Sequence, residues 1–178
     1  MESEDRKHWF VMRDLKRANA KHPAYRQLSD GGFEVFVPKE QRLVTRNGVR
    51  TCEEVPFIRD LLFVRDSRSN LDPVVERIPT LQYRWLRNTY RMPMTVDDAE
   101  MSRFMLAVST STAPRYYLPE EITPQMCGRR IHIIGGPLHD YEGSLITVRG
   151  SRVKRLLVEL KGFLAVGVEV NPEYIRLV

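Results

Sequence analysis

Basic and aromatic side chains of a kind that binds nucleic acid gather in two stretches of the sequence. The first stretch carries five basic residues around Tyr25, namely Lys16, Arg17, Lys21, His22 and Arg26. The second interleaves arginines with aromatic residues, namely Tyr83, Arg84, Trp85, Arg87, Tyr90 and Arg91. Cations follow phosphate groups while aromatic rings stack on unpaired bases, so this combination suits a single strand. A solvated basic face without a ligand is the alternative.

Residues that catalysis or metal binding would need are few and scattered. Cys52 and Cys127 are the only cysteines, and the four histidines lack the spacing of zinc ligands. Asp97, Asp98 and Glu100 crowd the start of a predicted helix, where carboxylates favour the helix dipole. No Ser-His-Asp set or phosphate-binding loop stands out. We therefore expect no enzyme, no cofactor and no bound metal.

Length and composition are typical of a soluble globular protein with one large or two small domains. The chain has 178 residues, a net charge of +5, 42% hydrophobic residues and 29% charged residues. No apolar run approaches the roughly 18–20 residues that cross a bilayer. The acidic start, residues 1–5, lacks the basic and apolar regions of a signal peptide. We expect a cytoplasmic monomer without membrane contact.

The first hundred residues predict an α+β fold. Runs rich in β-branched and aromatic residues predict strands at residues 7–13, 33–38, 61–64 and 81–86. Asn47-Gly48 is the strongest short hairpin signal and predicts pairing of the residues on either side of it. Helices are predicted at residues 23–29, 73–78 and 96–108. Helices against a mostly antiparallel sheet make an α/β sandwich.

Each predicted helix has its own start signal or apolar stripe. Pro23 suits the first turn of the first helix, and Asp72 resembles a cap that precedes Pro73 in the second. The third helix carries apolar residues at helical spacing, namely Met101, Phe104, Met105 and Val108. Residues 109–126 are then rich in Ser, Thr and Pro, which predicts an extended linker.

The rest of the chain predicts a small β-barrel. Alternating runs predict strands at residues 130–134, 145–148, 155–160, 165–170 and 174–177. Five short strands in about 50 residues predict a closed, SH3-like barrel, which hides its own edges. Gly136-Pro137 leaves the first strand and a lone Gly143 precedes the second. Glycine at Gly143 supplies either a positive φ or a close backbone approach.

The C-terminal stretch resembles a KOW domain, whose motif centres on a Gly-Pro turn and an essential glycine, here Gly136, Pro137 and Gly143. The whole chain resembles the NusG family of transcription elongation factors, which join an N-terminal NGN domain to a C-terminal KOW domain. The resemblance rests on residues 9–11, 35–38, 57–64, 78–81 and 136–148. It implies an NGN domain at 7–109, a linker at 110–126 and a KOW domain at 127–178.

One segment departs from the family pattern. Residues 58–61 read Ile-Arg-Asp-Leu, where the family commonly has Phe-Pro-Gly-Tyr or Phe-Pro-Asn-Tyr. This segment is similar to the specialised paralogues, in particular the antiterminators of capsular polysaccharide operons in Bacteroides-type bacteria. The resemblance implies that the factor binds the clamp helices of RNA polymerase, holds the clamp closed and promotes read-through of pauses and terminators. Such a factor shifts a conformational equilibrium and makes no bond.

The resemblance also implies the residues of the polymerase contact. An apolar pocket at the edge of the sheet would be lined by Ile58, Leu61 and Phe63, with Met12 and Tyr83 as neighbours. A role in the hydrophobic core is the alternative for these residues. The two basic stretches would contact the exposed non-template DNA strand or nascent RNA.

In the family, the KOW domain recruits partners such as ribosomal protein S10 or the termination factor Rho. Phe163 and Leu164 lie in a turn where such a partner could dock, and the alternative is that Phe163 closes the end of the barrel. The many β-branched residues predict a domain that stays a barrel. A KOW-type RNA-binding or ribosome-associated protein without polymerase activity is the alternative function.

Overall fold

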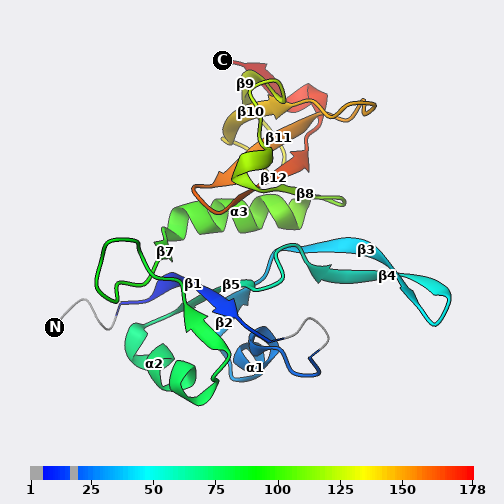
Figure 1. Ribbon diagram of the computed structural model, residues 1–178. Coiled ribbons are helices and arrows are strands. Elements are labelled where there is room, and N and C mark those ends of the chain that lie inside the picture. The colour runs from blue at the N-terminus through cyan, green and yellow to red at the C-terminus, as the bar shows by residue number, and fades with distance from the viewer. Residues whose placement is uncertain (1–5, 17–19) are drawn as a thin grey trace. The chain divides into compact units, whose positions relative to one another are not determined.

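The computed structural model describes residues 6–16 and 20–178 (Figure 1). Contacts between residues divide the chain into two compact units, Met1–Asp98 and Ala99–Val178. Arg17, one of the predicted nucleic-acid-binding residues, lies outside the described ranges. Within those ranges, no helix is both long and apolar enough to cross a membrane.

The sheet of the N-terminal unit is built around β1 (His8–Asp14). Antiparallel neighbours are β5 (Leu61–Asp66) and β6 (Leu81–Tyr83), and β7 (Thr95–Val96) also pairs with β1. β2 (Glu34–Phe36) pairs with β5 (Figure 1). These strands confirm the prediction of a mostly antiparallel sheet. β6 ends at Tyr83, short of the predicted residue 86, because the chain then turns into a separate hairpin.

Helix α1 (Ala24–Asp30) follows Pro23, as predicted. The backbone N–H of Ala24 donates to Asp14 Oδ2 at 2.6 Å, so the end of β1 satisfies a free donor at the helix start. The N–H of Gly31 donates to the carbonyl of Gln27 at 3.0 Å and closes the last turn. Proline before the helix and glycine after it therefore define α1.

Helix α2 (Arg68–Arg77) begins five residues before its predicted start at Pro73. Ser67 is its N-cap, because the Ser67 hydroxyl accepts from the N–H of Asn70 at 3.4 Å. Pro73 consequently lies inside the helix, and the prediction that Asp72 caps it was wrong. Both Leu71 and Val74 are buried, so burial of this apolar face offsets the hydrogen bond that Pro73 cannot make.

The main core of the N-terminal unit lies between one face of the sheet and the two helices. α1 contributes Ala24 and Leu28, and α2 contributes Leu71 and Val74. The complete buried cluster is Phe10, Met12, Ala24, Leu28, Leu62, Val64, Leu71, Val74, Ile78, Leu81 and Tyr83. This packing confirms the predicted α/β sandwich for this part of the chain.

The predicted hairpin at Asn47-Gly48 is confirmed. β3 (Lys39–Arg46) and β4 (Val49–Pro56) pair antiparallel along their full length as a separate two-stranded sheet (Figure 1). Asn47 and Gly48 have φ values of 50° and 77°, the left-handed pair that a type I′ turn requires. Leu43 in this hairpin is 70% exposed, so the hairpin has little core of its own.

Helix α3 (Asp98–Thr110) begins two residues later than predicted, because Thr95 and Val96 form β7 instead. Met101 and Phe104 of the predicted apolar stripe are buried, together with Ala107. Contacts assign residues from Ala99 onward to the C-terminal unit.

The C-terminal unit contains a sheet with strand order β13-β9-β10-β11-β12-β8. Its strands are β8 (Arg115–Tyr117), β9 (Cys127–Ile133), β10 (Glu142–Ile146), β11 (Arg155–Leu160), β12 (Leu164–Glu169) and β13 (Ile175–Leu177). The predicted strands are confirmed, but the prediction of a closed barrel was wrong. β13 and β8 occupy the two ends of the order, so the sheet does not close on itself.

β8 belongs to the segment that composition predicts as an extended linker. Its backbone pairs with β12, with Tyr116 opposite Val166 and Tyr117 opposite Ala165. A small buried cluster of Ile146, Leu157 and Ala165 packs against Tyr117 in this unit. Burial of these tyrosines therefore holds the Ser- and Pro-rich segment on the sheet.

Candidate functional site

The predicted apolar pocket is divided between the two faces of the N-terminal sheet. Met12 lies opposite Tyr83 across β1 and β6, and both belong to the core beneath α1 and α2. Phe63 lies opposite Val11, the residue before Met12, and successive residues of a strand point to opposite faces. Leu61 shares the face of Phe63. The structure therefore brings Leu61 and Phe63 together and separates them from Met12 and Tyr83.

Ile58 is the predicted pocket residue with accessible surface. It is half-buried in the turn before β5, where the N–H of Leu61 donates to its carbonyl at 3.2 Å. Leu61 and Phe63 are only 2% and 0% exposed. The ring of Phe36 lies 6.2 Å from that of Phe63 on this sheet face, which also carries Arg13 and Arg65.

Tyr83 is fixed by contacts within the N-terminal unit. Its hydroxyl donates to Asp72 Oδ1 at 2.8 Å, and its ring lies 5.6 Å from that of Phe10. Burial, followed by the hydrogen bond to Asp72, raises the pKa of the Tyr83 hydroxyl well above its ordinary value. The hydroxyl is therefore a neutral donor that ties β6 to α2.

The first basic stretch lies at the start of α1. Lys16 Nζ donates to the carbonyl of His22 at 2.7 Å, so these two predicted residues are neighbours. Lys21 and Arg26 are exposed. The Arg26 guanidinium lies 5.9 Å from the ring centre of Tyr25, a cation–π contact that holds basic and aromatic groups together.

The second basic stretch forms a hairpin over residues 84–94, which we call the aromatic hairpin. The N–H of Met94 donates to the carbonyl of Arg84 at 2.7 Å, and the N–H of Leu86 donates to that of Met92 at 2.9 Å. Arg84 is half-buried and Arg87 is exposed. Both basic stretches belong to the same compact unit.

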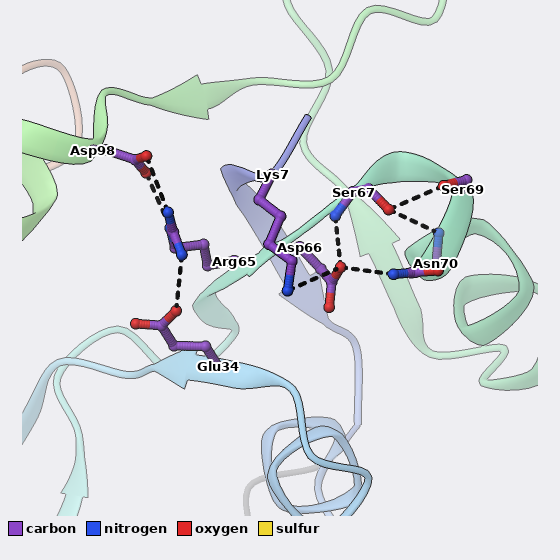
Figure 2. A network of polar contacts seen from close by, with 8 residues as sticks. All are labelled: Lys7, Glu34, Arg65, Asp66, Ser67, Ser69, Asn70 and Asp98. Atoms are coloured by element: carbon purple, nitrogen blue, oxygen red, sulfur yellow. Dashed lines mark hydrogen bonds and ion pairs between the residues drawn. The ribbon is translucent and has the colours of Figure 1, made fainter. Parts of the chain in front are cut away.

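A polar network at the C-terminal end of β5 was not predicted from the sequence (Figure 2). Arg65 donates two hydrogen bonds to the carboxylate of Asp98, each of 3.2 Å, and one of 3.4 Å to Glu34. The bond from Arg65 lowers the pKa of the Asp98 carboxyl below its ordinary value. The available signal was an arginine that follows directly on the apolar run of residues 61–64 in β5. The network joins β2, β5 and the first residue of α3.

Asp66 anchors the start of α2 in the same region (Figure 2). Its Oδ1 accepts from the N–H of Ser67 at 2.7 Å and from Asn70 Nδ2 at 2.9 Å, with Lys7 Nζ at 3.8 Å. All three contacts are made by Oδ1. They give Asp66 a structural role at the junction of β5 and α2.

The predicted KOW glycines have distinct roles in the C-terminal unit. Gly136 has a φ of 70°, which favours glycine. A Cβ added to Gly143 would lie 2.7 Å from the carbonyl oxygen of Leu157, so this position requires a close backbone approach. Tyr174 covers the turn, because a Cβ on Gly135 would lie 2.8 Å from its ring.

The two predicted partner-binding residues differ in accessibility. Leu164 is buried at the start of β12, whereas Phe163 is half-buried in the preceding turn. The N–H of Phe163 donates to the carbonyl of Leu160 at 3.0 Å, which fixes the turn. Phe163 is therefore the residue of the pair that a partner could reach.

Comparisons with known proteins place most of the chain in one family. A family model described as transcription termination factor nusG matches residues 7–105. The chain is similar to a solved structure of Thermotoga maritima NusG, reported for domain interaction in that protein, at 14% identity and a TM-score of 0.47. The match covers 97% of this chain and 98% of that chain. No curated protein matches.

The family match and the compact units end at different residues. The match continues to residue 105, whereas the contacts divide the chain after Asp98. The domain bounds 7–109, 110–126 and 127–178 therefore stay a prediction. Since the family model spans more than half of the chain, this protein belongs to the NusG family of transcription factors.

Proposed function

We propose that the protein binds RNA polymerase through its N-terminal unit and promotes antitermination. The observation that carries this proposal is the family match over residues 7–105, which spans the β1–β5–β6 sheet and both helices packed on it. NusG-family proteins act on transcription without chemical catalysis. Accordingly, the proposed activity is binding.

The proposed polymerase contact is the sheet face that carries Leu61 and Phe63, reached at Ile58. Leu61 and Phe63 on this face are buried, Arg13 and Arg65 share the face, and Ile58 has accessible surface in the turn before β5. Removing apolar surface from water contributes roughly 25 cal/mol per Å². Contact with the clamp helices of the polymerase would gain this term from the accessible part of Ile58, because Leu61 and Phe63 are already buried. Met12 and Tyr83 would support the contact from the opposite face.

The proposed mechanism is a shift in the conformational equilibrium of the polymerase. A factor that binds the closed-clamp state better than the paused state increases the population of the closed state in proportion to that difference in affinity. Reading through pauses and terminators follows, because the paused state is then less populated. No proton or group is transferred by the factor.

The first basic stretch would add a contact with the non-template DNA strand, or alternatively with nascent RNA. Lys21 and Arg26 are exposed, and Tyr25 beside them offers a ring to an unpaired base. Lys16 and His22 would act with them. Such binding must weaken steeply as salt is added.

The C-terminal unit would recruit a second partner, ribosomal protein S10 or Rho, through Phe163. Its KOW assignment rests on Gly136, Pro137 and Gly143, whose conformation and close packing suit a turn between two strands. The Ile-Arg-Asp-Leu sequence at residues 58–61 supports a specialised factor for particular operons, of which polysaccharide operons are the proposed case.

Substitution at Ile58 tests the polymerase contact. Ile58→Glu places a charge on accessible apolar surface without opening a cavity in the core, unlike a change at Leu61. The matched control is Leu43→Glu, which introduces the same group in the exposed β3–β4 hairpin. We expect Ile58→Glu alone to weaken binding to core polymerase at least tenfold. Equal binding by both folded variants would reject this face.

A further inference from the structure

Strand β8 is a short segment that covers one edge of the C-terminal sheet. Its residues 115–117 pair antiparallel with residues 165–167 of β12, whose other neighbour is β11 (Figure 1). Just before β8, the Thr112 hydroxyl donates to Glu169 Oε2 at 3.1 Å, so residues 112–117 lie along β12. Pairing at a sheet edge uses backbone groups that every sequence has, and another strand could therefore take the place of β8.

Buried polar atoms without partners accompany this segment. Ser111 Oγ and the Tyr117 hydroxyl come from residues 111–117, and Arg155 Nε comes from β11 beside β12. None of the three makes a hydrogen bond within residues 6–16 and 20–178. A buried polar group that loses its hydrogen bonds to water, and gains none, destabilises the folded state. The pairing of β8 with β12 is therefore weakened by the polar groups that it leaves without partners.

Tyr117 and Arg155 meet over Gly167. A Cβ added to Gly167 would lie 3.3 Å from Tyr117 Cε2 and 3.6 Å from Arg155 Cδ, so the two side chains approach the same point. Arg155 is 8% exposed, and no other cation is buried among the residues that the structure describes. Its Nη2 lies 3.5 Å from Glu169 Oε1, and its Nη1 lies 3.5 Å from Ser151 Oγ. Both contacts are longer than a good charge-assisted hydrogen bond, so the buried charge of Arg155 is incompletely compensated.

β8 presents no acidic side chain to Arg155. Paired residues of neighbouring strands share a face, so Arg115 and Tyr117 lie on the same face of the sheet as Arg155. Arg115 adds a second positive charge to this face, and Tyr117 offers no carboxylate. A carboxylate at the position of Tyr117 would face the buried guanidinium and compensate its charge.

A cavity of about 340 Å³ lies at the end of β12 where β8 stops. Leu164 and Ala165 line it from β12, and Pro119 and Ile122 line it from the segment that follows β8. That segment therefore leaves unfilled space against the sheet. A strand longer than β8 has room to continue in this direction.

We propose that β8 is an exchangeable strand, and that the edge of β12 binds an extended segment of a partner protein with a carboxylate side chain where β8 has Tyr117. The backbone hydrogen bonds to β12 would be equivalent for the two strands, and the carboxylate would pair with Arg155. Displacement of β8 would return the Tyr117 hydroxyl to water. The ligand is a protein, because a sheet edge presents N–H and C=O groups at the spacing of another strand.

The inference goes beyond the proposed polymerase contact, because it concerns the C-terminal unit and requires no polymerase. Its test uses the full chain and fluorescein-labelled peptides with the sequence of residues 112–118. One peptide carries Tyr117→Glu, and the matched control peptide carries Tyr117→Gln, which keeps the size and removes the charge. In fluorescence anisotropy, we expect the Tyr117→Glu peptide to bind at least tenfold more tightly, since it alone can pair with a buried cation.

Substitutions in the full chain test the competition and the ion pair separately. Tyr117→Ser removes the ring that packs on the buried cluster of Ile146, Leu157 and Ala165, and so weakens β8. Both peptides should then bind at least tenfold more tightly, because their competitor within the chain has a high effective concentration in wild type. Arg155→Gln should abolish the preference between the peptides. Lys154→Gln, an exposed neighbour, should retain it.

Hydrogen exchange of the wild-type chain gives a readout that needs no substitution in the protein. The amides of residues 115–117 should exchange faster than those of residues 156–158 in the middle of β11. Saturating Tyr117→Glu peptide should accelerate exchange at residues 115–117 further, because the bound peptide displaces β8.

Two outcomes would overturn the proposal. One is that neither peptide binds wild type or the folded Tyr117→Ser chain. The other is that the two peptides bind equally well, or that binding leaves hydrogen exchange at residues 115–117 unchanged. Loss of polymerase binding by Ile58→Glu, or its retention, would leave this inference standing.

Discussion

Replacing Tyr83 by phenylalanine should lower the free energy of unfolding by about 1 kcal/mol at neutral pH. The change removes only the hydroxyl, which donates a hydrogen bond of 2.8 Å to Asp72. Asp72 also lies 3.4 Å from Arg68 and 46% of its side chain is exposed, so water can replace the lost donor. The ring keeps its place 5.6 Å from Phe10. The loss is therefore that of one hydrogen bond, without a cavity.

The stabilisation by the hydroxyl should disappear at alkaline pH. Burial and the bond to Asp72 raise the pKa of Tyr83 above its ordinary value of 10.0. The folded state keeps the proton while the unfolded state releases it, so this stabilisation is complete below about pH 10 and is lost as the pH rises further. At about pH 11 the ionisation favours the unfolded state by about 1.4 kcal/mol, which cancels the advantage of wild type.

Urea titrations followed by circular dichroism measure this difference at neutral and alkaline pH. Subtracting the Tyr83→Phe curve from that of wild type removes the other titrating groups, which both proteins share. Tyr90→Phe is the matched control, since it removes an exposed tyrosine hydroxyl in the same unit. A difference that does not shrink with rising pH would refute the assigned hydrogen bond. Weaker polymerase binding by the folded Tyr83→Phe protein would show that its hydroxyl contacts the partner.

Three further substitutions test other parts of the account. Ile58→Glu should weaken polymerase binding at least tenfold in a pull-down titration, while Leu43→Glu should not. Gly143→Ala should destabilise the C-terminal unit by about 1–3 kcal/mol in thermal unfolding, because the added Cβ meets a backbone carbonyl at 2.7 Å; an unchanged melting temperature would contradict this contact. Asp98→Asn should remove up to about 1 kcal/mol of stability, since the ion pair is exposed. Because the pKa of Asp98 is lowered in the folded protein, the ion pair stabilises the fold above the ordinary carboxyl pKa. This stabilisation is lost as the pH falls through the pKa of the folded state, so the free energies of unfolding of wild type and variant should converge in acid.

Local sequence signals predicted the elements whose conformation depends on neighbouring residues. Asn47-Gly48 specifies its turn by backbone conformation alone, and Pro23 starts α1 in the same way. Alternation of apolar residues located the strands because one or both faces of each strand are buried. α2 was misplaced because Asp72-Pro73 is a plausible start, whereas burial of Leu71 requires the helix to begin earlier.

Local sequence signals could not predict contacts between segments that are distant in the sequence. β8 forms because its tyrosines pack against β12, about 50 residues later, which composition cannot reveal. The open order of the C-terminal sheet depends on the same pairing. The bond between Arg65 and Asp98 joins residues far apart in the sequence, and Asp98 alone was explained equally well by the helix dipole.

The candidate pocket likewise has features that residue types predicted and features that only the paired strands show. Residue types indicated apolar surface near Leu61 and Phe63, but only strand register shows that Met12 and Tyr83 face the opposite side of the sheet. Exposure at Ile58 likewise depends on the turn before β5. The exposed rings and arginines of residues 84–94 were visible in the sequence, whereas their presentation on one closed hairpin was not.

Binding of the purified full chain to core RNA polymerase, followed by single-round transcription across a pause and a terminator, tests the central claim most directly. The account predicts a stable complex and increased read-through, with both effects reduced by Ile58→Glu and retained by Leu43→Glu. Absence of a complex, or a complex that lengthens pauses and increases termination, would contradict it.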